Sequence, residues 1–241
     1  MSKVTSRKFF RALTYLFITH ASLHIFFIYI KDYFSRRHES NDIRNQVTGI
    51  FSTDWFSGNI PHWTLIFEKY FKKNKLINSL EIGSYEGRSS LFILANLPMA
   101  KLTCVDTWEG SDEHKNLKNI NSIENTFDSN TKAYSSRIRK FKGTSFNFFN
   151  TCSETEKFDL IYIDGSHFVN DVLIDALKGF EHLNVGGIMI FDDYFWDYYL
   201  DSSLNPATAI NSFLKLKKDY LSIKSVYAQL VIQKIADEIL N

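Results

Sequence analysis

Cysteine is scarce in this chain, which contains only Cys104 and Cys152. Two cysteines cannot form a disulfide framework, and these two stand at neither a CxxC nor a zinc-ligand spacing. We therefore expect both to be buried thiols in a reducing compartment.

Proline and glycine are also scarce, and neither sign of charge is in large excess. Three prolines and ten glycines leave no low-complexity linker, and no internal repeat is evident. The formal net charge is +1, so there is no global electrostatic argument for a nucleic-acid partner, and we expect none. What the chain does have is 44% hydrophobic residues over 241 positions, enough for one full domain plus an appendage.

The appendage is N-terminal, where residues 12–30 contain no Asp, Glu, Lys or Arg. At about 1.5 Å per residue, one helix over this run would roughly match a ~30 Å hydrocarbon core. Four basic residues precede it and four follow it, so charge does not choose an orientation. We expect residues 1–45 to be a basic N-terminus whose hydrophobic helix contacts a membrane, and residues 46–241 to form the folded domain. The alternatives are a helix packed on that domain or in a homo-oligomer interface, and a cleavable signal peptide without a convincing cleavage site.

Two apolar runs of strand length, Leu160–Ile163 and Ile188–Phe191, are separated by a segment long enough for a crossover helix. They predict a βαβ unit. Each run ends in carboxylates, at Asp164 and at Asp192-Asp193. In an open parallel sheet these side chains would face one crevice at the carboxyl ends of the strands. The alternative is a turn and a solvated strand end.

A glycine turn follows another predicted strand, Ile77–Gly83, and precedes a predicted helix, Gly87–Leu97. Glycine lets a ligand approach the backbone, and the helix N-terminus offers unpaired N–H groups. The G-x-G-x-x-G fingerprint is absent, which argues against a nicotinamide or flavin enzyme. Asp106 ends the next strand, 101–106, about 20 residues after the turn, where a carboxylate reaches ribose hydroxyls; the alternative is a strand-end turn.

Three further strands complete the prediction: 139–143, and a C-terminal antiparallel pair at 221–228 and 230–235. Ser145 opens a short helix, as a ligand contact or as a cap. Longer helices are expected over 62–73, 123–136 and 205–220, with a lid or a surface-packed aromatic loop at 50–63. The fold class is α/β: a Rossmann-like, doubly wound seven-stranded sheet with an antiparallel C-terminal hairpin and an N-terminal hydrophobic helix.

The turn also has the form E-x-G-x-Y-x-G-x-S, at Glu81, Gly83, Tyr85, Gly87 and Ser89. With it, the chain resembles class I S-adenosylmethionine-dependent methyltransferases over roughly residues 55–235. The resemblance is greatest to the small metal-dependent O-methyltransferases of the catechol and caffeoyl-CoA type and their sugar and macrolide relatives. It implies that S-adenosylmethionine is bound by this turn, supported by Glu81, by the ribose carboxylate and by an adenine-side turn; the predicted contacts are Glu81, Gly83, Ser84, Tyr85, Gly87, Ser89, Asp106, Ser145 and Asp164.

The same resemblance assigns a metal site to Asp164, Asp192 and Asp193. An all-oxygen carboxylate site suits a hard cation, with Mg²⁺ as the default and Mn²⁺ or Ca²⁺ as alternatives. His167 stands three residues after Asp164, where this family carries its general base, a Lys in the catechol type and a His in some sugar-directed relatives. Both adjacent aspartates can reach one metal only if the strand has already ended before them.

These residues predict a cytoplasmic methyltransferase that acts with metal assistance on a hydroxyl of a small molecule or sugar. Membrane contact through residues 12–30 would place it on the cytosolic side. The alternatives are a metal-independent methyltransferase and a non-catalytic scaffold with the cofactor fold. The scaffold is disfavoured because the motif residues are all retained.

Overall fold

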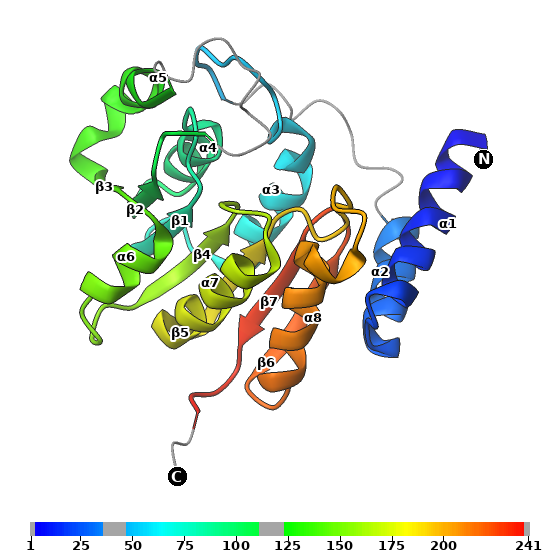
Figure 1. Cartoon of the computed structure of the whole chain (residues 1–241). Helices are drawn as coiled ribbons and strands as arrows, with labels where there is room; N and C mark the ends of the chain where they lie inside the picture. Colours follow the sequence, from blue (N-terminus) through cyan, green and yellow to red (C-terminus); the bar gives the residue numbers. More distant parts are fainter. Residues whose placement is uncertain (1–2, 36–46, 111–122, 239–241) are drawn as a thin grey trace. The chain divides into compact units, whose positions relative to one another are not determined.

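The computed structural model describes residues 3–35, 47–110 and 123–238 (Figure 1). By its contacts the chain divides into two compact units, Glu39–Ser166, and Met1–His38 together with His167–Asn241. The strands are hydrogen-bonded in the order β3-β2-β1-β4-β5-β7-β6. This confirms the predicted seven-stranded α/β sheet. The expected boundary between residues 45 and 46 falls outside the described ranges.

The unit 39–166 contributes four parallel strands. β1 (Ile77–Ile82) lies between β2 (Ala100–Asp106) and β4 (Phe158–Ile163), and β3 (Ile138–Lys142) pairs with the far side of β2. Because the strands are parallel, their carboxyl ends share one edge. The glycine turn, Asp106 and Asp164 therefore follow three neighbouring strands at that edge.

Helices of this unit surround an aromatic core. They are η3 (Ser57–Asn59), α3 (Ile60–Tyr70), α4 (Arg88–Asn96), α5 (Ile123–Thr131), η6 (Lys132–Arg137) and α6 (Ser145–Thr151). Trp63 of α3 is fully buried, with its ring centroid 4.7 Å from that of Tyr162 in β4. The helix predicted over 123–136 corresponds to two elements, the α-helix α5 followed directly by the 3₁₀-helix η6.

The two cysteines also belong to this unit. Cys104 of β2 is buried, as predicted. Cys152 is partly exposed, so that prediction is wrong for it, because Cys152 caps the C-terminus of α6 beside Glu156.

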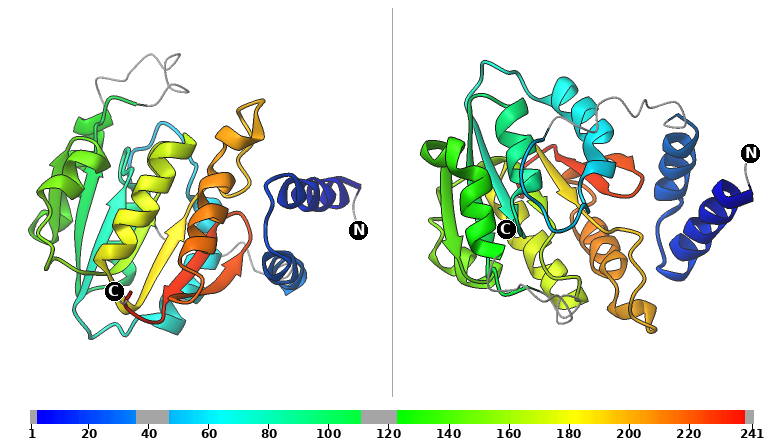
Figure 2. Two further views of the ribbon diagram at one scale, coloured as in Figure 1. Left: turned by 60° about the horizontal axis from the view of Figure 1, so that its bottom comes forward. Right: turned by 90° about the horizontal axis from the view of Figure 1, so that it is seen from above.

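The unit that includes residues 167–241 contributes the antiparallel strands β5 (Leu183–Phe191), β7 (Leu230–Lys234) and β6 (Leu221–Val226). This confirms the predicted antiparallel C-terminal hairpin. Its helices are α7 (Val169–His182), η7 (Ser202–Leu204) and α8 (Pro206–Leu216), and α7 and α8 lie side by side (Figure 2).

The single helix predicted over residues 12–30 is wrong, because the chain forms α1 (Lys3–Ile18) and α2 (Leu23–Ser35) instead. His20 between them has a left-handed φ of 55°. The carbonyl of Thr19 accepts a hydrogen bond from Asn211 Nδ2 at 3.0 Å, so it has a partner outside the helix. None of the described helices combines the length and apolar character needed to cross a bilayer. We call α1 and α2 the N-terminal hairpin.

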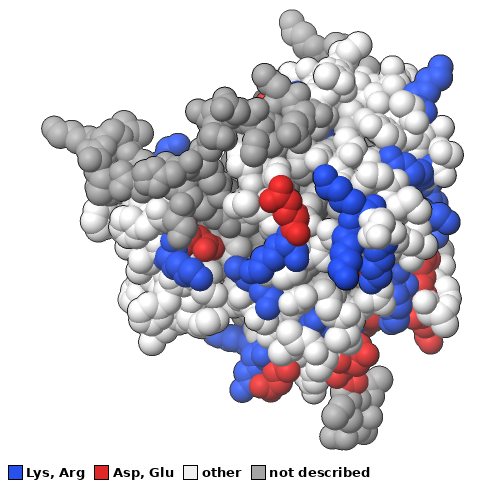
Figure 3. All heavy atoms as spheres, turned by 180° about the vertical axis from the view of Figure 1, so that it is seen from behind, with Lys and Arg blue, Asp and Glu red and all other residues white. Residues whose placement is uncertain are grey.

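Basic and acidic side chains are interspersed on the face of the molecule drawn in Figure 3. Within the unit 39–166, the strand β3 shows such pairing directly. Lys140 Nζ lies 2.8 Å from Glu124 and 2.7 Å from Asp128, and Arg139 lies 2.8 Å from Glu156. Exposed pairs of this kind each contribute little to stability, about 0–1 kcal/mol.

Candidate functional site

The turn after β1 has a backbone conformation that few residue types other than glycine adopt readily. Gly83, Tyr85 and Gly87 all have positive φ, at 85°, 46° and 83°. A Cβ on Gly83 would lie 1.9 Å from the carbonyl oxygen of Asp164, so this glycine is required by close approach as well as by φ. The β1 and β4 ends are thereby brought into backbone contact, with Asp164 N donating to Ile82 O at 2.8 Å.

Glu81 lies fully buried beneath this turn. Its carboxylate accepts hydrogen bonds from the hydroxyls of Ser84, at 2.8 Å, and Ser90. Burial raises the pKa of Glu81, and the hydroxyls of Ser89, Ser90 and Ser84 act against that rise. Glu81 therefore stabilises the turn from below and has no solvent-facing surface, and its role in a cofactor pocket stays a prediction.

Asp106 at the end of β2 organises the same turn. Its Oδ2 accepts from the backbone N–H groups of Ser84, at 2.8 Å, and Tyr85, at 2.7 Å, while Oδ1 accepts from Trp108 N at 2.7 Å. The Trp108 indole in turn donates to Tyr85 O at 2.9 Å. The spacing argument placed Asp106 at the ribose position but missed these bonds, which no sequence pattern signals.

The aromatic segment 50–63 packs on the turn. The rings of Trp55 and Tyr85 lie 5.1 Å apart, and Ser52 N donates to the carboxylate of Glu86 at 2.7 Å. Glu86 stands inside the motif, between Tyr85 and Gly87, and is only 5% exposed. These contacts place the segment against the predicted cofactor turn, as expected for a lid and equally for a packed aromatic loop.

Ser145 stands at the first position of α6. The cap is Thr144, whose side chain accepts from Asn147 N at 3.2 Å. Capping therefore does not occupy Ser145, and its assignment to the adenine side stays a prediction.

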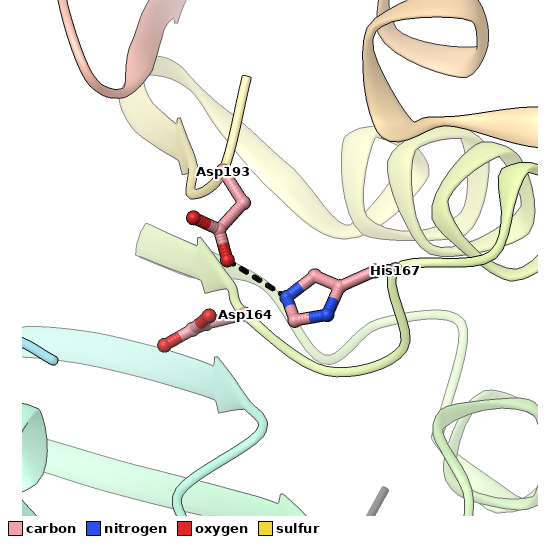
Figure 4. A group of neighbouring side chains, drawn as sticks. All are labelled: Asp164, His167 and Asp193. Atoms are coloured by element: carbon pink, nitrogen blue, oxygen red, sulfur yellow. Dashed lines mark ion pairs between the residues drawn. The ribbon is translucent and has the colours of Figure 1, made fainter. Parts of the chain in front are cut away.

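Asp164 follows β4, and its Oδ2 accepts from the hydroxyl of Tyr162 at 2.8 Å. His167 comes three residues later, and its Nε2 lies 2.8 Å from Asp193 Oδ2 (Figure 4). Asp164, His167 and Asp193 each offer one ligand atom, and these atoms lie within 4.8 Å of one another. This is the group, within the described ranges, whose donors are close enough to hold a metal ion.

Asp192 is not a member of that group. Strand β5 ends at Phe191, and Asp193 takes a left-handed φ of 52°, which turns its carboxylate toward His167. The Asp192 carboxylate instead accepts a hydrogen bond from Asp193 N at 2.8 Å. The chain thus leaves the strand before the pair, as two useful carboxylates would require, and Asp193 pairs with His167.

An aromatic residue covers the imidazole of His167. The ring of Trp196 lies 4.7 Å from it, at an interplanar angle of 30°. The carbonyl of Trp196 accepts a hydrogen bond from the Tyr15 hydroxyl of α1 at 2.7 Å, and Arg11 pairs with Asp197. The segment beside His167 is therefore bonded to the N-terminal hairpin, a kind of packing that the sequence analysis gave as an alternative to membrane contact.

Comparison with known proteins agrees with this geometry. Residues 80–194 match the family described as a methyltransferase domain. The chain is 28% identical over 137 residues to protein R132 of Acanthamoeba polyphaga mimivirus, an alignment that covers 57% of this chain and 59% of that protein.

Two solved structures share the fold. The O-methyltransferase TomG from Streptomyces achromogenes, in complex with SAM, has a TM-score of 0.54 at 14% identity, covering 73% of this chain and 81% of its own. MycE, a methyltransferase of mycinamycin biosynthesis in complex with Mg, SAH and mycinamycin VI, has a TM-score of 0.54 at 18% identity, covering 76% of this chain and 51% of its own. The predicted resemblance to class I methyltransferases is confirmed. Residues 80–194 are similar to a methyltransferase domain, and the solved structures share its fold.

Proposed function

We propose that this chain transfers the methyl group of S-adenosylmethionine to a hydroxyl of a small molecule or sugar, in the cytoplasm. The observation that carries the proposal is the pairing of His167 with Asp193 at 2.8 Å, in a group that includes Asp164. A neutral imidazole is suited to accept a proton near pH 7, since its unperturbed pKa is about 6.5. Asp193 would stabilise the imidazolium that forms.

In the proposed reaction His167 removes the hydroxyl proton while the oxygen forms a bond to the methyl carbon. The carbon–sulfur bond breaks, and its electron pair stays on sulfur, which becomes the neutral thioether of S-adenosylhomocysteine. The turn after β1, stiffened by Asp106 and Glu81, would hold the methionine and ribose parts of the donor. Gly83 would allow the donor close to the backbone.

The donor set fits a divalent cation. The carboxylates of Asp164 and Asp193 would be the oxygen ligands of Mg²⁺ or Mn²⁺, and His167 would stay off the metal to act as the base. A bound cation would make the acceptor hydroxyl more acidic. Asp192 is a further candidate ligand, because its hydrogen bond to Asp193 N uses only Oδ1.

A second candidate is methyl transfer without a metal. It is favoured by the direct contact between His167 Nε2 and Asp193 Oδ2, which is the arrangement of a histidine base oriented by a carboxylate. Asp164→Asn separates the two mechanisms. If the reaction is metal-assisted, Asp164→Asn loses both the activity and its response to Mg²⁺. If the reaction is metal-free, the rate is unchanged when chelator is added.

The deciding experiment is a calorimetric titration of S-adenosylmethionine into the full chain, first with Mg²⁺ and then with chelator, followed by assay of S-adenosylhomocysteine release with hydroxylated acceptors. We expect binding in the titration and product with at least one acceptor class. A folded chain that binds no donor would reject the enzyme and leave the scaffold. Donor binding with methylation of amines alone would reject the hydroxyl acceptor.

A further inference from the structure

The N-terminal hairpin exposes a stripe of large apolar side chains. Phe10 and Phe17 of α1 are 62% and 76% exposed, and Leu23, Phe27 and Phe34 of α2 are 76%, 70% and 50% exposed. The members of each set are separated by four or seven residues, which places them on one face of their helix. We call these five residues the apolar stripe.

The opposite faces of the two helices are buried. Ile25, Tyr29 and Tyr33 are spaced four apart on α2 and are at most 7% exposed. The ring of Tyr29 lies 5.1 Å from that of Phe195, so this face packs on the rest of its unit. The apolar stripe is therefore not the core-facing side of the hairpin.

Hydrogen bonds fix this orientation. Asp32 of α2 accepts from Ser225 Oγ at 2.8 Å and from Val226 N at 2.9 Å, both on β6. At the other end, Asn211 of α8 donates to Thr19 O at 3.0 Å. Because both ends are bonded to the unit, the hairpin cannot roll to bury the stripe without breaking these bonds.

The charge of the N-terminal segment indicates what kind of partner covers the apolar stripe. The first 31 residues contain five Lys or Arg and no Asp or Glu. A two-fold contact between the stripes of two copies would bring two basic segments together, and Asp197, the acidic partner of Arg11, lies outside the segment. Anionic lipid headgroups match the basic residues, and acyl chains match the phenylalanines and leucine.

We propose that the apolar stripe docks the protein on an anionic membrane surface, with α1 and α2 lying in the plane of the interface. The contact is made by side chains that already face away from the folded unit, so no rearrangement is needed. The inference concerns where the protein is held and does not depend on which group it methylates.

The test is co-sedimentation of the full chain with vesicles of phosphatidylcholine alone and of phosphatidylcholine with phosphatidylserine. We expect binding to the mixed vesicles that falls at least about tenfold in the triple variant Phe17→Ser, Leu23→Ser, Phe27→Ser, and falls with added salt. The matched control replaces three residues that are 50–63% exposed on other helices: Leu65→Ser, Phe146→Ser and Leu216→Ser. The control should bind as the intact chain does.

Three results would overturn the proposal: no binding by the intact chain, equal binding by the triple variant, or an equal loss in the control. Sedimentation velocity on the intact chain and the triple variant tests the competing occupant. A dimer that the triple variant abolishes, together with no lipid binding, would assign the stripe to a second copy. Far-ultraviolet circular dichroism verifies that each variant is folded.

Discussion

At the scale of single residues, His167 is the side chain on which the chemistry should depend most. It lies beside Asp193 and Trp196, both in the segment that follows β5 rather than in the turn after β1. We therefore expect His167→Ala to lower turnover by about 10²–10⁴-fold, the usual contribution of a general base, with little change in affinity for S-adenosylmethionine. The measurements are S-adenosylhomocysteine release and calorimetric titration.

The control for His167 is His24→Ala, which removes an exposed imidazole from α2 and should leave both values unchanged. If His167→Ala weakened donor binding as much as it slowed turnover, the residue would be structural and the base would lie elsewhere.

Glu81 offers a test of the buried support under the turn. Burial raises its pKa, so the folded state holds this proton more tightly than the unfolded chain does. The resulting contribution to stability is present below the ordinary carboxyl pKa, about 4.3, and is lost as pH rises through the folded-state pKa. Urea unfolding at several pH values should show the stability of the intact chain falling relative to Glu81→Gln as pH increases. Parallel curves for the two proteins would contradict this account.

At the scale of elements, the turn after β1 depends on glycine for two reasons that can be separated. Gly83 and Gly186 have nearly equal φ, 85° and 86°, but a Cβ would meet the Asp164 carbonyl at 1.9 Å in the first and nothing within 4 Å in the second. Gly186→Ala should cost about 1–2 kcal/mol, the left-handed penalty. Gly83→Ala should cost several kcal/mol more, because backbone must move.

Urea unfolding of the two variants measures that difference. Similar losses for both would mean that the close approach between the β1 turn and Asp164 relaxes easily. It would then not fix the geometry of the predicted donor site.

The elements that could be predicted from sequence are those whose ends are marked locally. β1, β2 and β4 were placed within two residues at their carboxyl ends because Gly83, Asp106 and Asp164 stop each apolar run. The break in the N-terminal helix has no such mark, since no glycine or proline lies between residues 12 and 30. It is associated with a hydrogen bond from Asn211, 192 residues away, which no local pattern contains.

At the scale of the whole molecule, sequence reasoning could gather the site residues because parallel strands end at one edge. It could not choose between Asp192 and Asp193, since that depends on the φ of Asp193. It kept two possibilities for the N-terminus, membrane contact and packing on the folded domain, and the structure bonds it to the segment beside His167.

That bond leads to a prediction about how the N-terminal hairpin affects catalysis. The Tyr15 hydroxyl donates to Trp196 O at 2.7 Å, and the Trp196 ring lies 4.7 Å from His167. Tyr15→Phe removes one largely buried hydrogen bond, worth about 1 kcal/mol, and keeps the ring in place. We expect turnover to fall about three- to tenfold, because Trp196 would no longer hold the His167 ring in position. The affinity for S-adenosylmethionine should be unchanged, because the turn predicted to bind it lies in the other unit.

Tyr29→Phe is the matched control, because Tyr29 is also a buried tyrosine of the hairpin and its ring remains against Phe195. Steady-state kinetics of both variants distinguish a role in positioning His167 from a general loss of stability. A positioning role lowers kcat in Tyr15→Phe alone, whereas a merely structural role lowers the melting temperature in both and leaves kcat unchanged at temperatures where they are folded. Since Tyr15 also lies on the helix that carries Phe10 and Phe17, a kcat effect confined to Tyr15→Phe would connect the hairpin that carries the apolar stripe to the proposed base, through the hydrogen bond to Trp196 and the ring contact of Trp196 with His167.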